Sequence, residues 1–290
     1  MFTGSMVALV TPFRDGKVDW ESLEGLISFH LKNGTDGIVP CGTTGESATL
    51  SHQEHDDIIR TVIKAVKKRV PVIAGTGSNS TEEAVRLTRE AEKSGADGAL
   101  MISPYYNRPT QEGIYQHYKK VAAAVGIPII VYNIPGRTGS KIEPETLARL
   151  SEIKNIAGVK EATGSVDQAI DVIRLCGGRL AVYSGEDSLI FSLMALGGKG
   201  VISTVANVAP KETAQLAEAC LKGNWEQGRE LQLKLMPLIR SLFIETNPIP
   251  AKTALSLMGK CSADLRLPLT PMAEGNLKRL RQAMTDFGLL

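Results

Sequence analysis

The sequence has few of the features that mark exported or membrane-spanning proteins. Its four cysteines, Cys41, Cys176, Cys220 and Cys261, form no CxxC pair and no dense framework, a pattern typical of free thiols in a reducing compartment. The N-terminal residues lack the basic segment of a signal peptide. Nowhere do the roughly 18 uncharged apolar residues of a membrane helix follow one another. We therefore expect a cytoplasmic protein that does not span a membrane.

Neither sign of charge dominates the chain. Lys and Arg together number 33 against 31 Asp and Glu, which gives a formal net charge of +2. Such a balance creates no field that would attract nucleic acid or an anionic membrane surface. Hydrophobic residues make up 43% of the 290 residues, enough for a sizeable core. A globular protein with a small-molecule partner is the expectation.

Short apolar runs alternate with longer charged segments of helical periodicity. Eight runs are predicted to be strands: 6–12, 37–40, 70–75, 98–103, 127–133, 156–161, 180–185 and 200–204. Candidate helices between them include 51–68, 80–94, 110–125, 143–152 and 186–196. Two of these begin with a capping box, Ser51-x-x-Glu54 and Ser80-x-x-Glu83.

Eight strand and helix units with strands apolar on both faces favour an α/β fold, a closed (β/α)8 TIM barrel. A doubly wound open sheet is the alternative. Four further helices are predicted after the last strand, at 209–222, 224–246, 249–258 and 272–287. We therefore predict a barrel domain at 1–208 and a C-terminal helical domain at 209–290.

Lys160 is the first charged residue of the sixth apolar run, 156–161, in "NIAGVKEATG". Active sites of such barrels lie at the C-terminal ends of the strands. A lysine there can snorkel or pair with Glu161, but strand alternation points Glu161 to the opposite face. Burial inside the barrel mouth would lower the pKa of Lys160, and a neutral amine can form a Schiff base with a carbonyl.

The loop "CGTTGES" follows the second strand. Its Gly42 and Gly45 flank the hydroxyls of Thr43 and Thr44, and the backbone N–H groups between them could converge on a carboxylate. An ordinary tight turn before the helix at Ser51 is about equally compatible with the motif alone.

The fifth strand ends in "YNIPGRTG". The phenol of Tyr132 is neutral at pH 7 and can pass a proton if another hydroxyl relays it, with Thr44 as the natural relay. Arg137 carries a planar fork suited to a second carboxylate. Tyr105 and Tyr106 are ambiguous, because aromatic pairs more often serve packing than catalysis.

With "GTTGES", "YNIPGRTG" and "AGVKEATG" on the second, fifth and sixth strands, the chain resembles the dihydrodipicolinate synthase family of Schiff-base pyruvate aldolases. The resemblance covers the whole chain, including "ETNPIPAK" at 245–252. It implies a lyase that condenses pyruvate with aspartate 4-semialdehyde to 4-hydroxy-tetrahydrodipicolinate, the committed step toward diaminopimelate and lysine. It implies no metal and no organic cofactor.

The same resemblance assigns roles to the residues. Lys160 would form the pyruvate imine, Thr43 and Thr44 would hold the pyruvate carboxylate, and Arg137 would bind the carboxylate of the semialdehyde. Tyr132 would move protons with Thr44 and with Tyr106, which would come from a neighbouring subunit. Gly185 and Ile202 would line the pocket with backbone groups.

The resemblance also implies feedback inhibition by L-lysine at a subunit interface. The matching positions are Ser47, Ala48, His52, His55, Asn79, Glu83 and Tyr105. A histidine pair without a nearby third ligand is weak evidence for metal, so an effector site is preferred. The family's usual homotetramer, a dimer of dimers, is the expected assembly.

Three alternatives remain at this point. N-acetylneuraminate lyase or a keto-deoxy-sugar acid aldolase of the same superfamily would share the lysine and the tyrosine. A metal-dependent aldolase would lose activity with a chelator. A non-catalytic ligand-binding barrel would give no adduct that borohydride can trap.

Overall fold

Eight parallel strands form the wall of a barrel in the computed structural model, which describes residues 2–290. They are β1 (Gly4–Ala8), β4 (Gly37–Val39), β5 (Ile73–Gly75), β6 (Gly98–Ile102), β7 (Ile129–Asn133), β8 (Ile156–Glu161), β9 (Ala181–Ser184) and β10 (Gly200–Ser203). Their order is β4-β1-β10-β9-β8-β7-β6-β5, and a parallel bridge between Ile38 and Val72 closes the remaining gap. The predicted (β/α)8 barrel is confirmed, and the open-sheet alternative is wrong.

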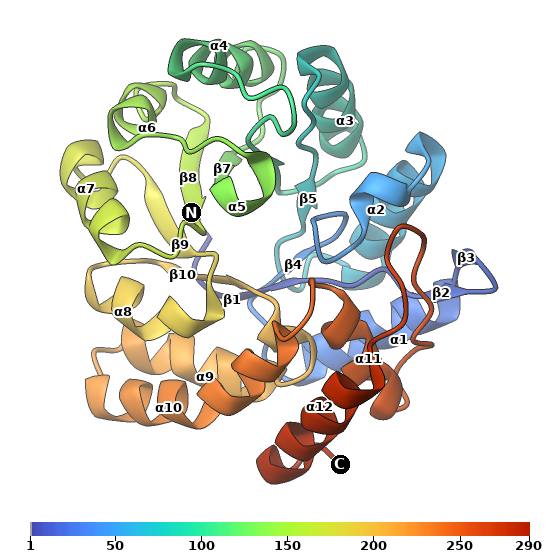
Figure 1. Cartoon of the computed structure of the whole chain (residues 1–290). Helices are drawn as coiled ribbons and strands as arrows, with labels where there is room; N and C mark the ends of the chain where they lie inside the picture. The colour runs from blue at the N-terminus through green and yellow to red at the C-terminus, as the bar shows by residue number, and fades with distance from the viewer. Residues whose placement is uncertain (1) are drawn as a thin grey trace.

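Helices surround these strands on the outside (Figure 1). They are α1 (Trp20–Lys32), α2 (His52–Val66), α3 (Thr81–Lys93), α4 (Gln111–Ala122), α6 (Pro144–Leu150), α7 (Val166–Cys176) and α8 (Ile190–Ala195). The short α5 (Pro135–Thr138) directly follows β7 and lies inside this ring of helices (Figure 1). Short 3-10 turns follow three strands: η1 (Ser47–Thr49), η2 (Asp187–Leu189) and η3 (Val205–Asn207). A small antiparallel hairpin pairs β2 (Phe13–Arg14) with β3 (Lys17–Val18).

The two predicted capping boxes differ in the structure. At the start of α2, Ser51 Oγ accepts from the N–H of Glu54 and the Glu54 carboxylate accepts from the N–H of Ser51, so this box is complete. At the start of α3, Ser80 Oγ accepts from the N–H of Glu83. The Glu83 carboxylate instead contacts His52 and Ser78, so the second box is only half formed. The Glu83 carboxylate therefore bonds to two side chains and not to the backbone N–H of Ser80.

Four helices follow the barrel: α9 (Pro210–Leu221), α10 (Trp225–Leu242), α11 (Ile249–Leu257) and α12 (Glu274–Phe287). They lie together on one side of the barrel (Figure 1), and α9 packs against β1. Leu216, Leu235 and Leu280 of these helices belong to the same hydrophobic cluster as Val7 and Ile58 of the barrel. The C-terminal helical part is therefore confirmed, while its division from the barrel at residue 208 stays a prediction.

The longest helix is α10, with 18 residues, and charged side chains recur along it. Among residues 2–290, no helix combines the length and the apolar character needed to cross a membrane.

Candidate active site

Lys160 and Tyr132 lie side by side at the C-terminal ends of β8 and β7. The two residues are partners in the register of these strands. Both side chains are buried, and Lys160 Nζ lies 4.3 Å from the centroid of the Tyr132 ring. Glu161 faces the other way, where it accepts hydrogen bonds from Asn133 Nδ2 at 3.1 Å and from the N–H of Thr163 at 2.8 Å. Lys160 therefore has no carboxylate partner on its own strand.

Burial lowers the pKa of Lys160 to about 8. The nearby positive charge of Arg137 acts in the same direction, while the negative charges of Asp187 and Glu186 oppose it. About a tenth of the amine is then neutral at pH 7, against well under a thousandth for a solvated lysine. The site thus supplies a nucleophilic amine near neutral pH without a second base.

Tyr132 stays protonated across the physiological range. Burial raises its pKa to about 12, although the positive charge of Arg137 and a hydrogen bond with the Thr43 side chain act in the opposite direction. Thr43 is half-buried, whereas Thr44 is buried. Thr44 Oγ1 accepts from Asn247 Nδ2 at 3.0 Å. The proton relay between Tyr132 and Thr44 stays a prediction.

The loop after β4 is a series of tight turns. The N–H of Gly45 donates to the carbonyl of Gly42, and the N–H of Glu46 donates to the carbonyl of Thr43, both at 3.1 Å. A Cβ on Gly45 would lie 3.1 Å from the carbonyl oxygen of Leu9, so a larger residue would push the loop away from the barrel. The tight-turn alternative is correct as local geometry, and binding of a carboxylate by the same loop stays a prediction.

Arg137 lies in the short helix α5, directly after β7. Its side chain is exposed at the mouth of the barrel, and Nη2 donates to the backbone carbonyl of Asn247 at 3.0 Å. Its remaining donors are available for a bidentate contact with an anion. A cation at the entrance and a buried amine beside it suit a substrate that carries both a carbonyl group and a carboxylate.

A cavity of about 450 Å³ opens at this end of the barrel. Thr43, Tyr132, Arg137 and Asn247 line one part of it. Six of the seven predicted effector residues also line it: Ser47, Ala48, His52, His55, Glu83 and Tyr105. Lys160 is not a wall residue, because its amine lies against the Tyr132 ring. The cavity thus joins Tyr132 and the predicted substrate-binding residues Thr43 and Arg137 to most of the predicted effector residues.

Gly185 and Ile202 lie at the ends of β9 and β10. A Cβ on Gly185 would lie 3.1 Å from Lys160 Cε and 2.6 Å from the Cβ of Ala162, so the lysine side chain depends on a glycine here for space. Ile202 is buried in the barrel interior. Their proposed contacts with substrate stay predictions.

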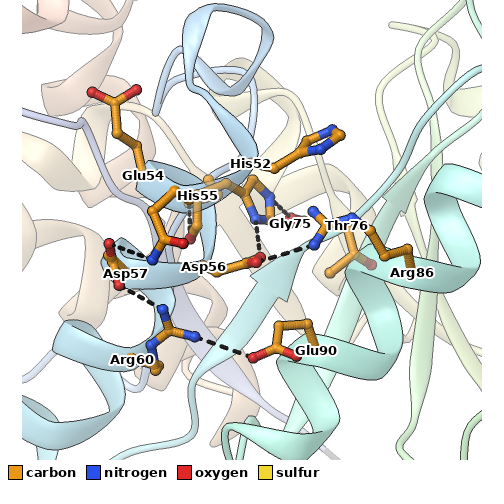
Figure 2. A network of polar contacts seen from close by, with 12 residues as sticks. His52, Glu54, His55, Asp56, Asp57, Arg60, Gly75, Thr76, Arg86 and Glu90 are labelled. Carbon is orange, nitrogen blue, oxygen red and sulfur yellow. Dashed lines mark hydrogen bonds and ion pairs between the residues drawn. The ribbon is translucent and has the colours of Figure 1, made fainter.

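The two histidines of α2 have different surroundings (Figure 2). His52 Nε2 lies 2.7 Å from Glu83 Oε1. His55 is buried, which lowers its pKa, and its Nε2 donates to the carbonyl of Gly75 at 2.8 Å. They therefore do not converge on one point. The part of the chain that the structure describes contains no group of three His, Cys, Asp or Glu residues placed to hold a metal ion.

Asn79, Tyr105 and Tyr106 lie at the edge of the site. Asn79 is not a wall residue of the cavity, and its carbonyl accepts from Asn107 Nδ2 at 2.9 Å. Tyr105 turns toward the cavity, whereas Tyr106 is 89% exposed and has φ of +73°. A tyrosine in the left-handed region is uncommon, and it places this ring outside the subunit. The contact of Tyr106 with a neighbouring subunit stays a prediction.

Glu186, Asp187 and Asn247 were not predicted from the sequence. Asp187 is buried, and its Oδ2 accepts from the N–H groups of Thr204 at 3.1 Å and Val205 at 2.7 Å. Burial raises the pKa of Glu186, and the charge of Asp187 acts in the same direction. Both acids directly follow Gly185 at a strand end, so the strand-end rule could have found them. No local signal pointed to Asn247.

The sequence matches the model of the "Dihydrodipicolinate synthetase family" over residues 1–286. It is 57% identical over 290 residues to the 4-hydroxy-tetrahydrodipicolinate synthase of Geotalea uraniireducens, with all of both chains covered. The enzyme of the same name from Syntrophus aciditrophicus is 59% identical over 290 residues, again with complete coverage of both chains.

Solved structures of similar proteins have the same fold. The chloride-inhibited dihydrodipicolinate synthase from Acinetobacter baumannii, complexed with pyruvate, is 49% identical with a TM-score of 0.99 over 100% of both chains. The enzyme from Cyanidioschyzon merolae with lysine bound is 42% identical with a TM-score of 0.96, covering 100% of this chain and 99% of that one. A monomeric dihydrodipicolinate synthase variant is 45% identical with a TM-score of 0.98, covering 100% and 98%.

Proposed function

Because the chain belongs to the dihydrodipicolinate synthetase family, we propose that it is a lyase that condenses pyruvate with aspartate 4-semialdehyde. The product is 4-hydroxy-tetrahydrodipicolinate, an intermediate of amino-acid biosynthesis on the way to diaminopimelate and lysine. The observation that carries the mechanism is the buried amine of Lys160, whose pKa of about 8 leaves it partly neutral beside the phenol of Tyr132.

The first step is formation of an imine between Lys160 and pyruvate. The neutral amine attacks the ketone carbon, and the carbinolamine then loses its hydroxyl as water, for which Tyr132 can provide the proton. The resulting C=N nitrogen carries a positive charge. This charge makes the bound pyruvate a stronger carbon acid than free pyruvate.

Carbon–carbon bond formation follows from that charge. The methyl group of the bound pyruvate loses a proton, and its electron pair moves toward the cationic nitrogen to give an enamine. The enamine carbon attacks the aldehyde carbon of the semialdehyde, and the aldehyde oxygen takes up a proton. The substrate's own amine then attacks the imine carbon, closes the ring and releases Lys160.

Two groups would hold the two carboxylates apart. Thr43 and Thr44, with the N–H groups of their loop, bind the carboxylate of pyruvate near Lys160. Arg137 binds the carboxylate of the semialdehyde at the mouth, where its planar fork is exposed. Gly185 and Ile202 contribute backbone groups to the wall. Binding two anions about one substrate length apart leaves the reacting carbons between them.

The chemistry needs no metal and no organic cofactor, because the imine nitrogen is the electron sink. A chelator should therefore leave the rate unchanged, whereas a metal-dependent aldolase would lose activity. We also propose a cytoplasmic location, for which the support is the scattered pattern of four free cysteines.

L-lysine is the proposed feedback inhibitor. The related enzyme from C. merolae has been solved with lysine bound. Glu83 can accept a lysine ammonium group, although His52 and Ser78 now occupy its two oxygens and would have to share it. Ser47, Ala48, His55, Asn79 and Tyr105 complete the proposed site. Tyr105 is adjacent in sequence to Tyr106, which gives a short physical route from effector to proton relay.

We propose a homotetramer, arranged as a dimer of dimers, as the active assembly. The support is Tyr106, whose exposed ring has no function within its own subunit in the proposed mechanism. One relative is described as a monomeric variant, and sedimentation velocity of this chain tests the proposed tetramer.

Trapping the imine tests the proposed function. We expect that incubation with pyruvate followed by borohydride adds one pyruvate-derived group to the peptide that contains Lys160. Lys160→Ala should give no adduct, and Lys154→Ala, which changes an exposed lysine just before β8, should give the normal one. An adduct on another lysine, or none, would contradict the mechanism. Formation of the cyclic product only with aspartate 4-semialdehyde would separate the synthase from sugar-acid aldolases.

A further inference from the structure

The segment 247–252, which leads into and begins α11, contacts the loop after β4 at two points. Asn247 Nδ2 donates to Thr44 Oγ1 at 3.0 Å. Lys252 Nζ donates to Glu46 Oε1 at 2.7 Å. The two contacts flank Gly45, so the C-terminal segment holds this loop on both sides. The imine chemistry itself gives Asn247, Lys252 and Glu46 no role.

The ion pair between Lys252 and Glu46 is completely buried, with 0% and 1% of the side chains exposed. Lys252 Nζ also donates to the carbonyl of Asp264 at 2.6 Å and lies 4.0 Å from the centroid of the Phe13 ring. The second oxygen of Glu46 accepts from the N–H of Arg266 at 3.2 Å. Both charges are therefore fully engaged.

Stability alone is a poor explanation for such a pair. Removing two charges from water has a large desolvation cost, and replacement by well-packed uncharged residues is often neutral or stabilising. A buried ion pair does, however, impose one geometry on the groups that carry it. Its directional contacts cannot be satisfied if the loop moves.

The loop needs an external restraint because its backbone is strained. Cys41 and Glu46, at its two ends, have φ of +56° and +52°, in the left-handed region that side chains disfavour. Residues in such conformations persist where the surrounding structure over-determines them. Glu46 follows Thr44 by two residues, so a contact that holds Glu46 in place also limits movement of the backbone that carries the threonines and of the N–H groups between them.

Asn247 extends the same restraint to the second substrate. Its side chain is buried, and the residue lines the cavity. Its amide holds Thr44, and its backbone carbonyl accepts from Arg137 Nη2 at 3.0 Å. One residue thus fixes the distance between the proposed pyruvate loop and the proposed semialdehyde arginine.

We propose that Asn247 and Lys252 are positioning residues that hold the loop from Thr43 to Glu46 in its carboxylate-binding shape. The inference rests on the proposed function, because it assigns the loop to pyruvate. The C-terminal helical part then belongs to the active site through segment 247–252, although it contributes no reacting group.

A comparison of single and double variants separates positioning from stability. Lys252→Met leaves the buried Glu46 without its cationic partner, so we expect a lower unfolding temperature and weaker pyruvate binding. Glu46→Gln combined with Lys252→Met removes both charges, and its unfolding temperature should return to near that of the wild type. The pyruvate concentration that gives half-maximal borohydride trapping should, however, stay roughly tenfold above that of the wild type. A tenfold change corresponds to the loss of about one well-placed hydrogen bond.

Lys222→Met is the matched control, because it breaks an exposed ion pair with Glu218 on α9, away from the loop. It should change neither measurement. Asn247→Ala is an independent test that keeps the buried pair. It should raise the half-maximal concentration of pyruvate in trapping, because it removes the contact with Thr44 and keeps the backbone carbonyl that accepts from Arg137.

The inference would be overturned if the double variant regained both the unfolding temperature and the pyruvate affinity of the wild type. It would also be overturned if Asn247→Ala bound pyruvate as tightly as the wild type. Failure of the proposed function would look different: the wild-type protein itself would then give no adduct with pyruvate at any concentration.

Discussion

At the scale of single residues, burial of Lys160 lowers the stability of the fold and makes its amine a better nucleophile. Its pKa is about 8 in the folded chain, against 10.5 for a solvated lysine. Burial is the main cause, so the same feature that makes the amine nucleophilic also opposes folding while the amine is protonated. Asp187 and Glu186 reduce this cost without removing it.

Lys160→Met should therefore stabilise the protein at neutral pH. The folded chain binds fewer protons than the unfolded one between the two pKa values of this lysine, so its destabilising effect is complete below pH 8 and disappears as the pH approaches 10.5. The difference in pKa corresponds to a gain of about 3 kcal/mol in the free energy of unfolding at pH 7. Urea unfolding at pH 7 and pH 10.5 measures it.

Lys154→Met is the control for this prediction. Lys154 is exposed, so its replacement should change the free energy of unfolding by less than about 0.5 kcal/mol at either pH. If Lys160→Met were no more stable than the wild type at pH 7, the amine would not be desolvated as described.

Much of the site could be predicted residue by residue. Lys160, Tyr132 and the loop with Thr43 and Thr44 each end or follow an apolar run, and a parallel barrel brings all such ends to one face. The choice between two adjacent threonines could not be predicted. The structure buries Thr44 and leaves Thr43 half-buried, and the relay between Tyr132 and Thr44 stays a prediction.

At the scale of elements, hydrophobic periodicity predicted all eight strands and most helices. The helices α1 and α7 lay outside the predicted ranges. Gly25 lies in the middle of α1, and glycine there is less favourable than alanine by about 1 kcal/mol. In α7 the β-branched residues, including Val166, Ile170 and Val172, are typical of a strand. Packing against the barrel outweighs both local preferences.

The outer faces of α2 and α3 are joined by a polar network (Figure 2). Asp56 accepts from Arg86 Nη1 at 3.0 Å and lies 3.6 Å from His55 Nδ1, and its side chain is only 14% exposed. Asp57 accepts from Arg60 Nη2 at 2.5 Å, but its side chain is 39% exposed. Two neighbouring carboxylates on one helix thus make similar contacts in different surroundings.

Asp56→Ala should destabilise the protein by about 1–3 kcal/mol, because it removes the largely buried carboxylate that accepts from Arg86 Nη1 and lies beside the buried ring of His55. Asp57→Ala should have an effect below about 1 kcal/mol, since water can replace the exposed contact. Urea unfolding at low and high salt measures both. Equal effects, or an Asp56→Ala effect that salt abolishes, would show that burial does not set the strength of this network.

At the scale of the whole molecule, the exposed position of Tyr106 has no explanation within a single chain. Its ring is almost fully exposed and its backbone is in the left-handed region. In the proposed assembly it completes the active site of a neighbouring subunit. This arrangement makes a specific prediction about mixtures of two variants.

Tyr106→Phe and Tyr132→Phe should each be nearly inactive alone, yet active when co-expressed. In a mixed dimer, one active site receives Tyr132 from the first variant and Tyr106 from the second, while the other site lacks both. Random pairing then gives one intact site in about four, so about a quarter of wild-type turnover is expected. Steady-state assays of the unselected co-expressed mixture, at the same protein concentration as the wild type, measure it.

If Tyr106 acted within its own subunit, every site in the mixture would lack one tyrosine, and no activity would return. A Tyr106→Phe variant with full turnover would contradict any role for this hydroxyl. Sedimentation of each variant gives the control, because a change on the exposed ring should leave the fold intact.

The sequence by itself determined the barrel and its helical appendix and pointed to the residues proposed to react, because periodicity and strand ends are local properties. Only the tertiary structure decided which groups restrain them. Asn247 meets Thr44 across 203 residues and Lys252 meets Glu46 across 206, contacts that depend on how α11 packs against the barrel. The lowered pKa of Lys160 likewise depends on the tertiary structure, because burial produces it and the lysine is buried only when the whole chain has folded.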